Sequence, residues 1–310
     1  MKINKPKFWD KKNSIIAILL LPLSLVYVVL IFLKKFFTRA RNFKIPIVCI
    51  GNIYLGGTGK TPAAILLTKK LQESGKNPVI IRKYYKNHFD EFNLIKKDIK
   101  SLIISKSRVN GLLEAEKSDY DLAILDDGFQ DYRIKKNLNI ICFNNNQLIG
   151  NGLTLPSGPL RENLSTLKSA DILIINGSNN EKFEKKVLRI NKKLEIVYSS
   201  YNPSNLDEFK NKKLIAVAGI GNPENFFQLI EKNNLKIEKK LVFPDHYEFK
   251  KTEIQNIINE ADENNCQVIM TEKDYFKINH FNLDKINYLK VSLDIPEIKK
   301  ILNKINELYD

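Results

Sequence analysis

Glycines, a lysine and a threonine stand close together in the stretch Gly51-Asn52-Ile53-Tyr54-Leu55-Gly56-Gly57-Thr58-Gly59-Lys60-Thr61-Pro62. Glycine lets the backbone turn its N–H groups toward one anion, because no Cβ blocks a positive φ. Lys60 can add a full charge for the β- and γ-phosphates of a nucleotide, and the Thr61 hydroxyl can ligate Mg²⁺. The stretch therefore predicts binding of ATP and Mg²⁺ by Gly56, Gly57, Thr58, Gly59, Lys60 and Thr61.

The flanks of this stretch favour a P-loop. An apolar run at residues 45–50 precedes it and predicts a buried strand, and a helical apolar pattern follows from Ala63 to Leu71. A glycine loop between a strand and a helix points its N–H groups and the helix N-terminus at one anion. The common spacing has glycine where Tyr54 stands here. The alternative interpretation is a glycine-rich turn with an unrelated Lys-Thr pair.

Two adjacent carboxylates are the second candidate group. Asp126 and Asp127 come directly after the apolar run at residues 121–125. In P-loop proteins an acid at this position holds Mg²⁺. Two neighbouring acids also repel each other unless a cation or a base lies between them. We therefore expect Asp126 and Asp127, with Thr61, to form the metal site, and a surface turn is the alternative.

Further polar groups follow other apolar runs. Asp90 and Glu91 come after the run at residues 79–82, and Gln130 lies one turn beyond the aspartates. The loop at residues 150–162 ends in Arg161-Glu162, and an arginine fork suits a phosphate. Because a parallel sheet brings the carboxyl ends of its strands to one edge, these groups are expected to converge. The alternatives are a solvated acidic pair and an Arg161 paired with Glu162.

The composition limits the classes of partner. The chain has 310 residues, enough for two α/β lobes, and a net charge of +15, which suits anionic partners. It has no interleaved basic and aromatic module of an RNA- or DNA-binding type, so nucleic acid is not an expected partner. Its three cysteines, Cys49, Cys142 and Cys266, form no Cys-x-x-Cys pair and are expected to be small buried hydrophobes in a reducing compartment.

The N-terminal segment predicts contact with a membrane. Residues 14–33 are almost entirely apolar and carry no charge, and a helix of about 20 residues spans a bilayer core. Lysines and arginines flank both ends and suit anionic lipid headgroups, so the positive-inside rule selects no orientation. Pro22 can kink the segment, which leaves a helix lying in one leaflet as a second interpretation. A buried core helix is the third.

Strand and helix patterns alternate through the rest of the chain. From Phe43 to about Ser200 they predict a mostly parallel sheet covered by helices. A new strand at residues 214–219, a His246 in the loop Pro244-Asp245-His246, and a terminal helix at residues 296–309 follow. The predicted domains are a hydrophobic segment at 1–42, a P-loop NTPase-like lobe at 43–205 and a smaller α/β lobe at 206–310.

Taken together, these motifs resemble the tetraacyldisaccharide 4′-kinase family, the lipid A 4′-kinases. The resemblance covers nearly the whole chain and includes the displaced glycine of the P-loop. The motifs of the second lobe that carry it begin at Ala218, Phe243 and Thr271. The matching blocks are Gly56-Gly57-Thr58-Gly59-Lys60-Thr61-Pro62, Asp126-Asp127-Gly128-Phe129-Gln130, Gly150-Asn151-Gly152, Leu155-Pro156-Ser157-Gly158-Pro159-Leu160-Arg161-Glu162, Ala218-Gly219-Ile220-Gly221-Asn222-Pro223, Phe243-Pro244-Asp245-His246 and Thr271-Glu272-Lys273-Asp274.

The resemblance implies an activity and roles for single residues. It implies transfer of the ATP γ-phosphate to the 4′-hydroxyl of an acylated glucosamine disaccharide 1-phosphate, in lipid A biosynthesis at the cytoplasmic face of the inner membrane. Asp90 is then the candidate base, assisted by His246, while Lys60 binds phosphate. The candidates for contact with the lipid substrate are Gln130, Arg161 and Glu162. Phe89 and Phe92 stand here where the family has Gly and Pro.

Two other classes of function are compatible with a P-loop of crowded glycines. A membrane-associated switch ATPase would hydrolyse ATP when a partner stimulates it, but gives no reason for the loops of Arg161 and His246. A membrane-anchored nucleotide sensor without catalysis is the other. The sequence leaves the oligomeric state and the acyl-chain preference open.

Overall fold

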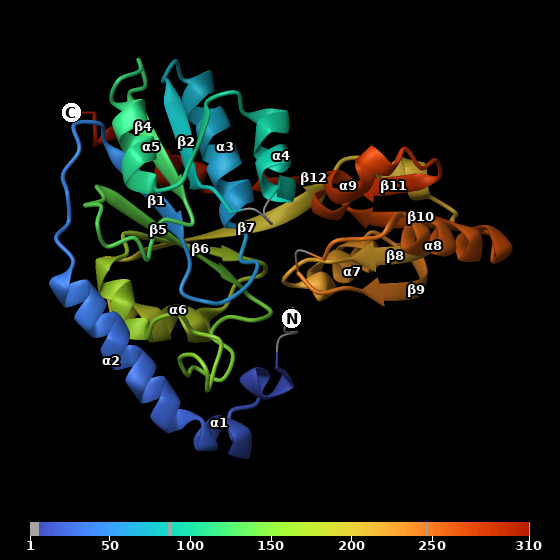
Figure 1. Ribbon diagram of the computed structural model, residues 1–310, viewed down its shortest axis with the longest axis horizontal. Helices are drawn as coiled ribbons and strands as arrows, with labels where there is room; N and C mark the ends of the chain where they lie inside the picture. Colours follow the sequence, from blue (N-terminus) through green and yellow to red (C-terminus); the bar gives the residue numbers. More distant parts are fainter. Residues whose placement is uncertain (1–5, 86–88, 246, 310) are drawn as a thin grey trace. The chain divides into compact units, whose positions relative to one another are not determined.

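Short runs of isoleucine, leucine and valine form an eight-stranded sheet in the order β12-β7-β6-β5-β1-β4-β2-β3 (Figure 1). The six pairings from β7 to β3 are parallel. Every residue of β1, β4 and β6 is buried, as expected for a parallel sheet covered on both faces. The strands are β1 (Ile47–Gly51), β2 (Pro78–Lys83), β3 (Leu102–Ser105), β4 (Leu122–Asp126), β5 (Leu138–Asn144), β6 (Ile172–Asn176), β7 (Glu195–Pro203) and β12 (Val291–Asp294).

The computed structural model describes residues 6–85, 89–245 and 247–309, and the chain divides into two compact units. The larger unit consists of Lys5–Tyr84, Ile99–Ser200 and Ile295–Asp310. Its helices are α1 (Ile15–Leu19), α2 (Leu21–Phe37), α3 (Lys60–Glu73), α5 (Arg108–Ala115), α6 (Glu181–Leu188) and α10 (Ile298–Asn306), with short 3₁₀ turns η1 (Lys7–Asp10) and η2 (Leu164–Ser169).

The smaller unit, which includes Tyr85–Asp98 and Tyr201–Asp294, has a four-stranded sheet in the order β11-β10-β8-β9. Its three pairings are parallel. Alternate residues of β8 pack into two separate hydrophobic clusters, so both faces of this sheet are covered. The elements are α4 (Phe89–Asp98), η3 (Leu206–Phe209), β8 (Lys213–Ala218), α7 (Pro223–Lys232), β9 (Lys236–Val242), α8 (Lys251–Glu263), β10 (Cys266–Thr271), α9 (Glu272–Ile278), η4 (Asn279–Phe281) and β11 (Ile286–Leu289).

Neither unit is a single continuous stretch of the sequence. The predicted ranges 43–205 and 206–310 treat each lobe as continuous, whereas α4 groups with the smaller unit and α10 with the larger one. The C-terminal helix α10 buries Ile301 and Ile305, and its Lys304 Nζ lies 3.2 Å from Glu195 Oε1. The predicted α/β class with mostly parallel sheets is confirmed.

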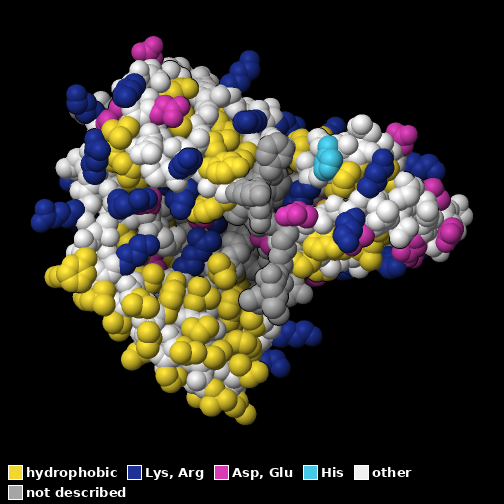
Figure 2. Space-filling model, in the orientation of Figure 1, with side chains coloured by type: hydrophobic (Ala, Val, Ile, Leu, Met, Phe, Trp, Pro, Cys, Tyr) yellow, Lys and Arg dark blue, Asp and Glu magenta, His cyan; other side chains and the backbone are white. Residues whose placement is uncertain are grey.

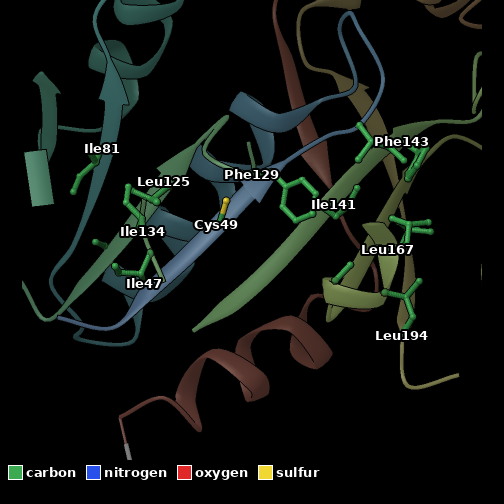
Figure 3. Packing of buried hydrophobic residues seen from close by; sticks show 14 of the residues in the cluster. Ile47, Cys49, Ile81, Leu125, Phe129, Ile134, Ile141, Phe143, Leu167 and Leu194 are labelled. Carbon is green, nitrogen blue, oxygen red and sulfur yellow. The ribbon is translucent and has the colours of Figure 1, made fainter. Parts of the chain in front are cut away.

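One large hydrophobic cluster of the larger unit lies against one face of its sheet (Figure 3). Cys49 of β1, Leu125 of β4 and Phe129 take part in this cluster. Cys49 and Cys142 are buried as predicted, and burial raises the pKa of the Cys49 thiol to about 11. Cys266 is partly exposed, which differs from the expectation for this cysteine.

The apolar N-terminal segment forms two helices and not one. The prediction of a single helix of about 20 residues is wrong, because α1 ends at Leu19 and α2 begins at Leu21. Pro22 lies in the first turn of α2, where its missing N–H costs no helical hydrogen bond. In the part of the chain that the structure describes, no helix has both the length and the apolar character to cross a membrane.

The polar atoms of this segment face the larger unit and its large apolar side chains face outward. Ser24 is 4% exposed, and its Oγ lies 2.9 Å from Thr154 O and 2.8 Å from Ser157 Oγ. Tyr27 donates its hydroxyl to Arg161 O at 2.9 Å. Phe36 is 72% exposed, and Figure 2 shows a continuous apolar surface over the lower part of the larger unit. A buried core helix is therefore ruled out.

Gly51, at the end of β1, approaches Phe129 too closely for a side chain. An alanine Cβ at this position would lie 2.4 Å from Phe129 Cβ. Such overpacking costs about 1–3 kcal/mol, so Gly51→Ala should lower the free energy of unfolding in urea by about that amount. Gly57→Ala is the control, because a Cβ there meets nothing within 4 Å. Equal stability of the two variants would contradict the close approach.

Candidate active site

The loop between β1 and α3 holds glycines in conformations that suit glycine. Gly56 has a φ of 137° and Gly59 a φ of 89°, values that other residues rarely adopt. Gly59 is the N-cap of α3, which begins at Lys60. The partial positive charge of this helix N-terminus therefore lies at the glycine loop, as a phosphate site requires.

A buried asparagine to which the sequence analysis assigned no role holds the loop in shape. Asn52 Nδ2 lies 2.6 Å from Tyr54 O and 3.1 Å from both Gly56 O and Thr58 Oγ1. Gln130, for which contact with the substrate stays a prediction, donates to Asn52 O at 2.9 Å. The sequence feature that could have indicated the role of Asn52 is its position as a polar residue directly after a buried strand.

The pairing of β1 with β4 brings the first aspartate to the loop. Asp126 lies opposite Ile50 in the parallel ladder. Thr61 Oγ1 donates to Asp126 Oδ2 at 2.9 Å, so the two principal metal candidates are in contact. Asp126 is fully buried, and its Oδ1 has no hydrogen-bond partner among the residues described.

The second aspartate is held between two cations. Lys60 Nζ lies 3.5 Å from Asp127 Oδ1, and Arg161 Nη1 lies 3.2 Å from the same oxygen. Arg161 thus pairs with Asp127 and not with its neighbour Glu162, which accepts a hydrogen bond from Thr166 Oγ1 at 2.9 Å. The fold brings together Lys60, Asp127 and Arg161, which are far apart in the sequence.

Two buried arginines, to which no predicted role was attached, complete the cluster. Arg82 of β2 pairs with Asp126 and donates to Thr61 Oγ1 at 3.1 Å. Arg108, the first residue of α5, donates to Asp127 O at 2.7 Å. In the sequence, the position of Arg82 as a charged residue at the end of the apolar run 79–82 could have indicated a role in the site. No comparable feature marks Arg108.

Positive charge exceeds negative charge in this cluster, which suits an anionic ligand. Burial raises the pKa of Asp127, but the surrounding cations outweigh it and hold this pKa below its usual range. Asp127 therefore stays ionised at neutral pH and keeps its two ion pairs. The cations that lower its pKa are Lys60, Arg161, Arg108 and Arg82.

The residues fit Mg²⁺ shared with a nucleotide. Within residues 6–85, 89–245 and 247–309, no three or more His, Cys, Asp or Glu side chains gather as a metal cage. Mg²⁺ is commonly held by one or two carboxylates plus substrate phosphates, so no such cage is needed. The unpartnered Oδ1 of Asp126 and the adjacent Thr61 hydroxyl are the hard oxygen atoms that such a site uses.

The two candidates for proton transfer belong to the smaller unit. Asp90 lies in the first turn of α4, and its side chain lies outside what the structure describes, as does His246. Their described neighbours are held by α9. Glu272 pairs with Lys97 of α4, and Lys273 Nζ lies 3.1 Å from Asp245 Oδ1.

The rest of the Thr271-Glu272-Lys273-Asp274 motif anchors α9 itself. Thr271 is the N-cap and accepts from Asp274 N at 3.1 Å. The fully buried Asp274 accepts from Gly219 N at 2.7 Å and pairs with Lys277 at the same distance. The motif therefore connects the turn after β8, α4 and the loop of Asp245.

Comparisons with known proteins agree over the full chain. A family model described as tetraacyldisaccharide-1-P 4′-kinase matches residues 16–92 and 86–308. A tetraacyldisaccharide 4′-kinase of Pelagibacter ubique is 42% identical, with 100% of this chain and 99% of the relative covered. One of Rickettsia bellii is 33% identical, with 98% of each covered. The fold resembles the crystal structure of LpxK from Aquifex aeolicus in complex with ATP, with a TM-score of 0.72, 23% identity, and 96% and 100% of the two chains covered.

The lowered pKa of Asp127 predicts a pH-dependent stability. The carboxylate stabilises the fold fully above its unfolded pKa of 3.8, and this contribution is lost as the pH falls through the lower folded pKa. Asp127→Asn should therefore be less stable in urea at about pH 7, and its deficit should shrink in more acidic buffer. The exposed Asp284→Asn is the control, expected within about 0.5 kcal/mol of wild type. A deficit independent of pH would contradict the argument.

Proposed function

Because the chain belongs to the tetraacyldisaccharide-1-P 4′-kinase family, we propose that it transfers the γ-phosphate of ATP to the 4′-hydroxyl of a tetraacyl glucosamine disaccharide 1-phosphate. It is an ATP-dependent phosphotransferase of lipid A biosynthesis. The observation that carries this function is the contact of Lys60 and Thr61 with Asp127 and Asp126 at one sheet edge.

The nucleotide is assigned to the P-loop of the larger unit. Backbone N–H groups from Gly56 to Thr61 and the N-terminus of α3 receive the β- and γ-phosphates, and Lys60 neutralises them. Thr61 and Asp126 would hold Mg²⁺, which supplies further neutralisation of phosphate charge, with Asp127 beside them. Phosphoryl transfer depends on positioning and charge stabilisation, so these contacts should supply most of the rate.

Proton removal is assigned to the smaller unit. Asp90 accepts the proton of the 4′-hydroxyl, and His246 adjusts the basicity of Asp90. Such a base contributes typically about 10²–10⁴-fold. The Glu272–Lys97 pair and the Lys273–Asp245 pair support this assignment, because one helix, α9, holds the elements that carry both residues.

Arg161 is proposed to bind a phosphate of the lipid acceptor. Its guanidinium is a bidentate donor and already lies at the Asp127 cluster. Gln130 and Glu162 are assigned to the surroundings of the acceptor. Gln130 is hydrogen-bonded to Asn52 O directly after β1, and Glu162 follows Arg161 in the same loop. The switch ATPase alternative is not favoured, because full-length relatives carry the name of the lipid kinase.

The N-terminal segment is proposed to lie in the interface of the inner membrane, on its cytoplasmic side, where ATP is available. Large apolar side chains cover its outer surface, among them Leu25 at 70% and Phe37 at 75% exposure. Lysines and arginines at both ends suit anionic headgroups. An amphipathic helix of this kind binds in the plane of the interface, which agrees with the break at Leu20.

Labelled ATP and acylated disaccharide 1-phosphate in detergent test the kinase reaction. Lys60→Ala should abolish labelling of the lipid, because the phosphates lose their main cation. Asp90→Ala should slow turnover by about 10²–10⁴-fold and leave ATP affinity nearly unchanged. Wild-type turnover in Asp90→Ala would exclude it as the base, and ATP hydrolysis without lipid labelling would favour the switch ATPase.

Vesicle sedimentation tests the membrane surface. Each buried phenylalanine contributes about 1.5–3 kcal/mol, so Phe36→Ser with Phe37→Ser should weaken binding to phosphatidylglycerol vesicles by more than about tenfold. Val242→Ser is the control, because Val242 is 61% exposed but lies in the smaller unit. Unchanged binding of the double variant would exclude this surface as the main contact.

A further inference from the structure

The apolar helix α2 carries two hydroxyl side chains, and both face inward. Ser24 and Tyr27 lie three residues apart, which places them on one side of the helix. Ser24 is buried and Tyr27 is half-buried, whereas Leu25 and Val26 between them are exposed. The side of α2 that carries its hydroxyl groups is therefore the side that packs against the rest of the larger unit.

These two hydroxyl groups bind the loop of residues 154–161. Ser24 Oγ lies 2.9 Å from Thr154 O and 2.8 Å from Ser157 Oγ, and it accepts from Ser157 N at 3.0 Å. Tyr27 donates its hydroxyl to Arg161 O at 2.9 Å. Burial raises the pKa of the Tyr27 hydroxyl, so this group stays a donor at neutral pH.

The same loop is also bound to the chain that leads into the glycines of the P-loop. Arg161 N donates to Ile53 O at 2.7 Å, and Leu55 N donates to Pro159 O at 2.8 Å. Both contacts are between backbone groups. Residues 154–161 are therefore hydrogen-bonded to α2 and to the residues that directly precede Gly56.

Arg161 is held at three points. Ile53 binds its N–H, Tyr27 binds its carbonyl, and Asp127 binds its guanidinium, with Nη1 3.2 Å from Oδ1 and 3.4 Å from Oδ2. Of the three contacts, the one to the carbonyl comes from the apolar helix. A side chain is placed precisely when hydrogen bonds fix the backbone that carries it, so the Tyr27 hydroxyl contributes to the position of the guanidinium.

We propose that Tyr27 and Ser24 are positioning residues of the active site: their hydroxyl groups hold the 154–161 loop so that Arg161 meets an anionic group of the acceptor in one orientation. This rests on the proposed function in taking that anion as a phosphate of the lipid. An apolar helix that served only as a membrane contact would need no hydroxyl groups, and losing one oxygen from it would leave the reaction unchanged.

Kinase kinetics with Tyr27→Phe test the proposal, because this change removes one oxygen and keeps the ring. The KM for acylated disaccharide 1-phosphate in detergent should rise by about 3–10-fold, within the usual net contribution of one hydrogen bond. The kcat and the KM for ATP should stay within about 1.5-fold of wild type, because the P-loop contacts the loop through other groups. Ser24→Ala should shift the lipid KM in the same direction.

A double variant separates positioning from a general structural effect. If Tyr27 acts through the Arg161 guanidinium, Tyr27→Phe should cause no further loss in an Arg161→Gln background, whereas independent effects would multiply. Arg161→Lys replaces Arg161→Gln if the latter leaves no measurable turnover. Binding to phosphatidylglycerol vesicles should not weaken in Tyr27→Phe, because the exposed apolar side chains of α2 are unchanged.

Thr38→Val is the matched control. Thr38 lies at the end of the same helix, but its Oγ1 donates to Lys34 O within that helix and not to the 154–161 loop. Removing this hydroxyl should leave the lipid KM within about 1.5-fold of wild type. An equal rise of KM in Thr38→Val and Tyr27→Phe would reduce the effect to a general property of the helix and overturn the proposal.

Hydrogen–deuterium exchange of the full chain without ATP or lipid gives a readout that does not depend on the kinase reaction. Amide exchange at residues 154–161 should be faster in Tyr27→Phe and Ser24→Ala than in wild type and Thr38→Val. Unchanged exchange, an unchanged lipid KM, or an equal loss with and without Arg161 would each overturn the proposal. Faster exchange without lipid labelling by wild type would remove the kinase function and still support the holding of the loop.

Discussion

The parallel pairing of β1 with β4 is the constraint on which the site depends. It puts Asp126 opposite Ile50, where the chain turns into the glycine loop. A slip of one residue would replace the carboxylate by Leu125 and point every side chain of the strand to the other face. Because both strands are buried along their whole length, such a slip would also misplace much of the core. The contact of Thr61 with Asp126 is therefore maintained by hydrophobic packing far larger than the contact itself.

A second consequence of this sheet edge is an excess of positive charge, with Arg82 and Arg108 buried and Lys60 and Arg161 partly exposed. Lys60 and Arg161 share Asp127, while Arg82 takes Asp126. Arg108 is placed differently, since it donates to backbone carbonyls of both aspartates. Burying cations is costly unless each finds an acceptor, and here the carboxylates and backbone carbonyls of the two aspartates supply acceptors to all four cations. Such a cluster is arranged in advance for an anion, so little reorganisation is needed when phosphate arrives.

The apolar surface and the charge cluster are connected through one loop of the larger unit. Ser24 and Tyr27 of α2 are bound to residues 154–161, and Arg161 at the end of that loop reaches Asp127. Trp9 adds a further contact, because its Nε1 donates to Pro156 O at 3.0 Å. The segment that carries the exposed apolar side chains is thus hydrogen-bonded to the loop whose Arg161 pairs with Asp127.

Local sequence was sufficient for some of these features. The glycines of the P-loop, the aspartates after an apolar run and the α/β alternation are short-range patterns, and the structure has the expected strand, loop and helix around Lys60. The uncharged run at residues 14–33 predicted contact with a membrane, and the structure leaves most of its large apolar side chains exposed. The sequence did not decide whether this run breaks at Leu20, since proline permits a kink at Pro22 but also suits the first turn of a helix.

Other features were decided only in three dimensions. No pattern near Arg82, Arg108 or Asn52 indicates their partners, because those partners come from neighbouring strands and from the loop. The grouping of α4 with the smaller unit and of α10 with the larger unit likewise depends on contacts between residues that are far apart in the sequence. Local sequence patterns report which side of an element is apolar and where glycines cluster. They therefore determined the strands, the glycine loop and the apolar N-terminal segment. Which charges meet depends on strand order and register, which arise from packing between distant segments, and only the tertiary structure decided them.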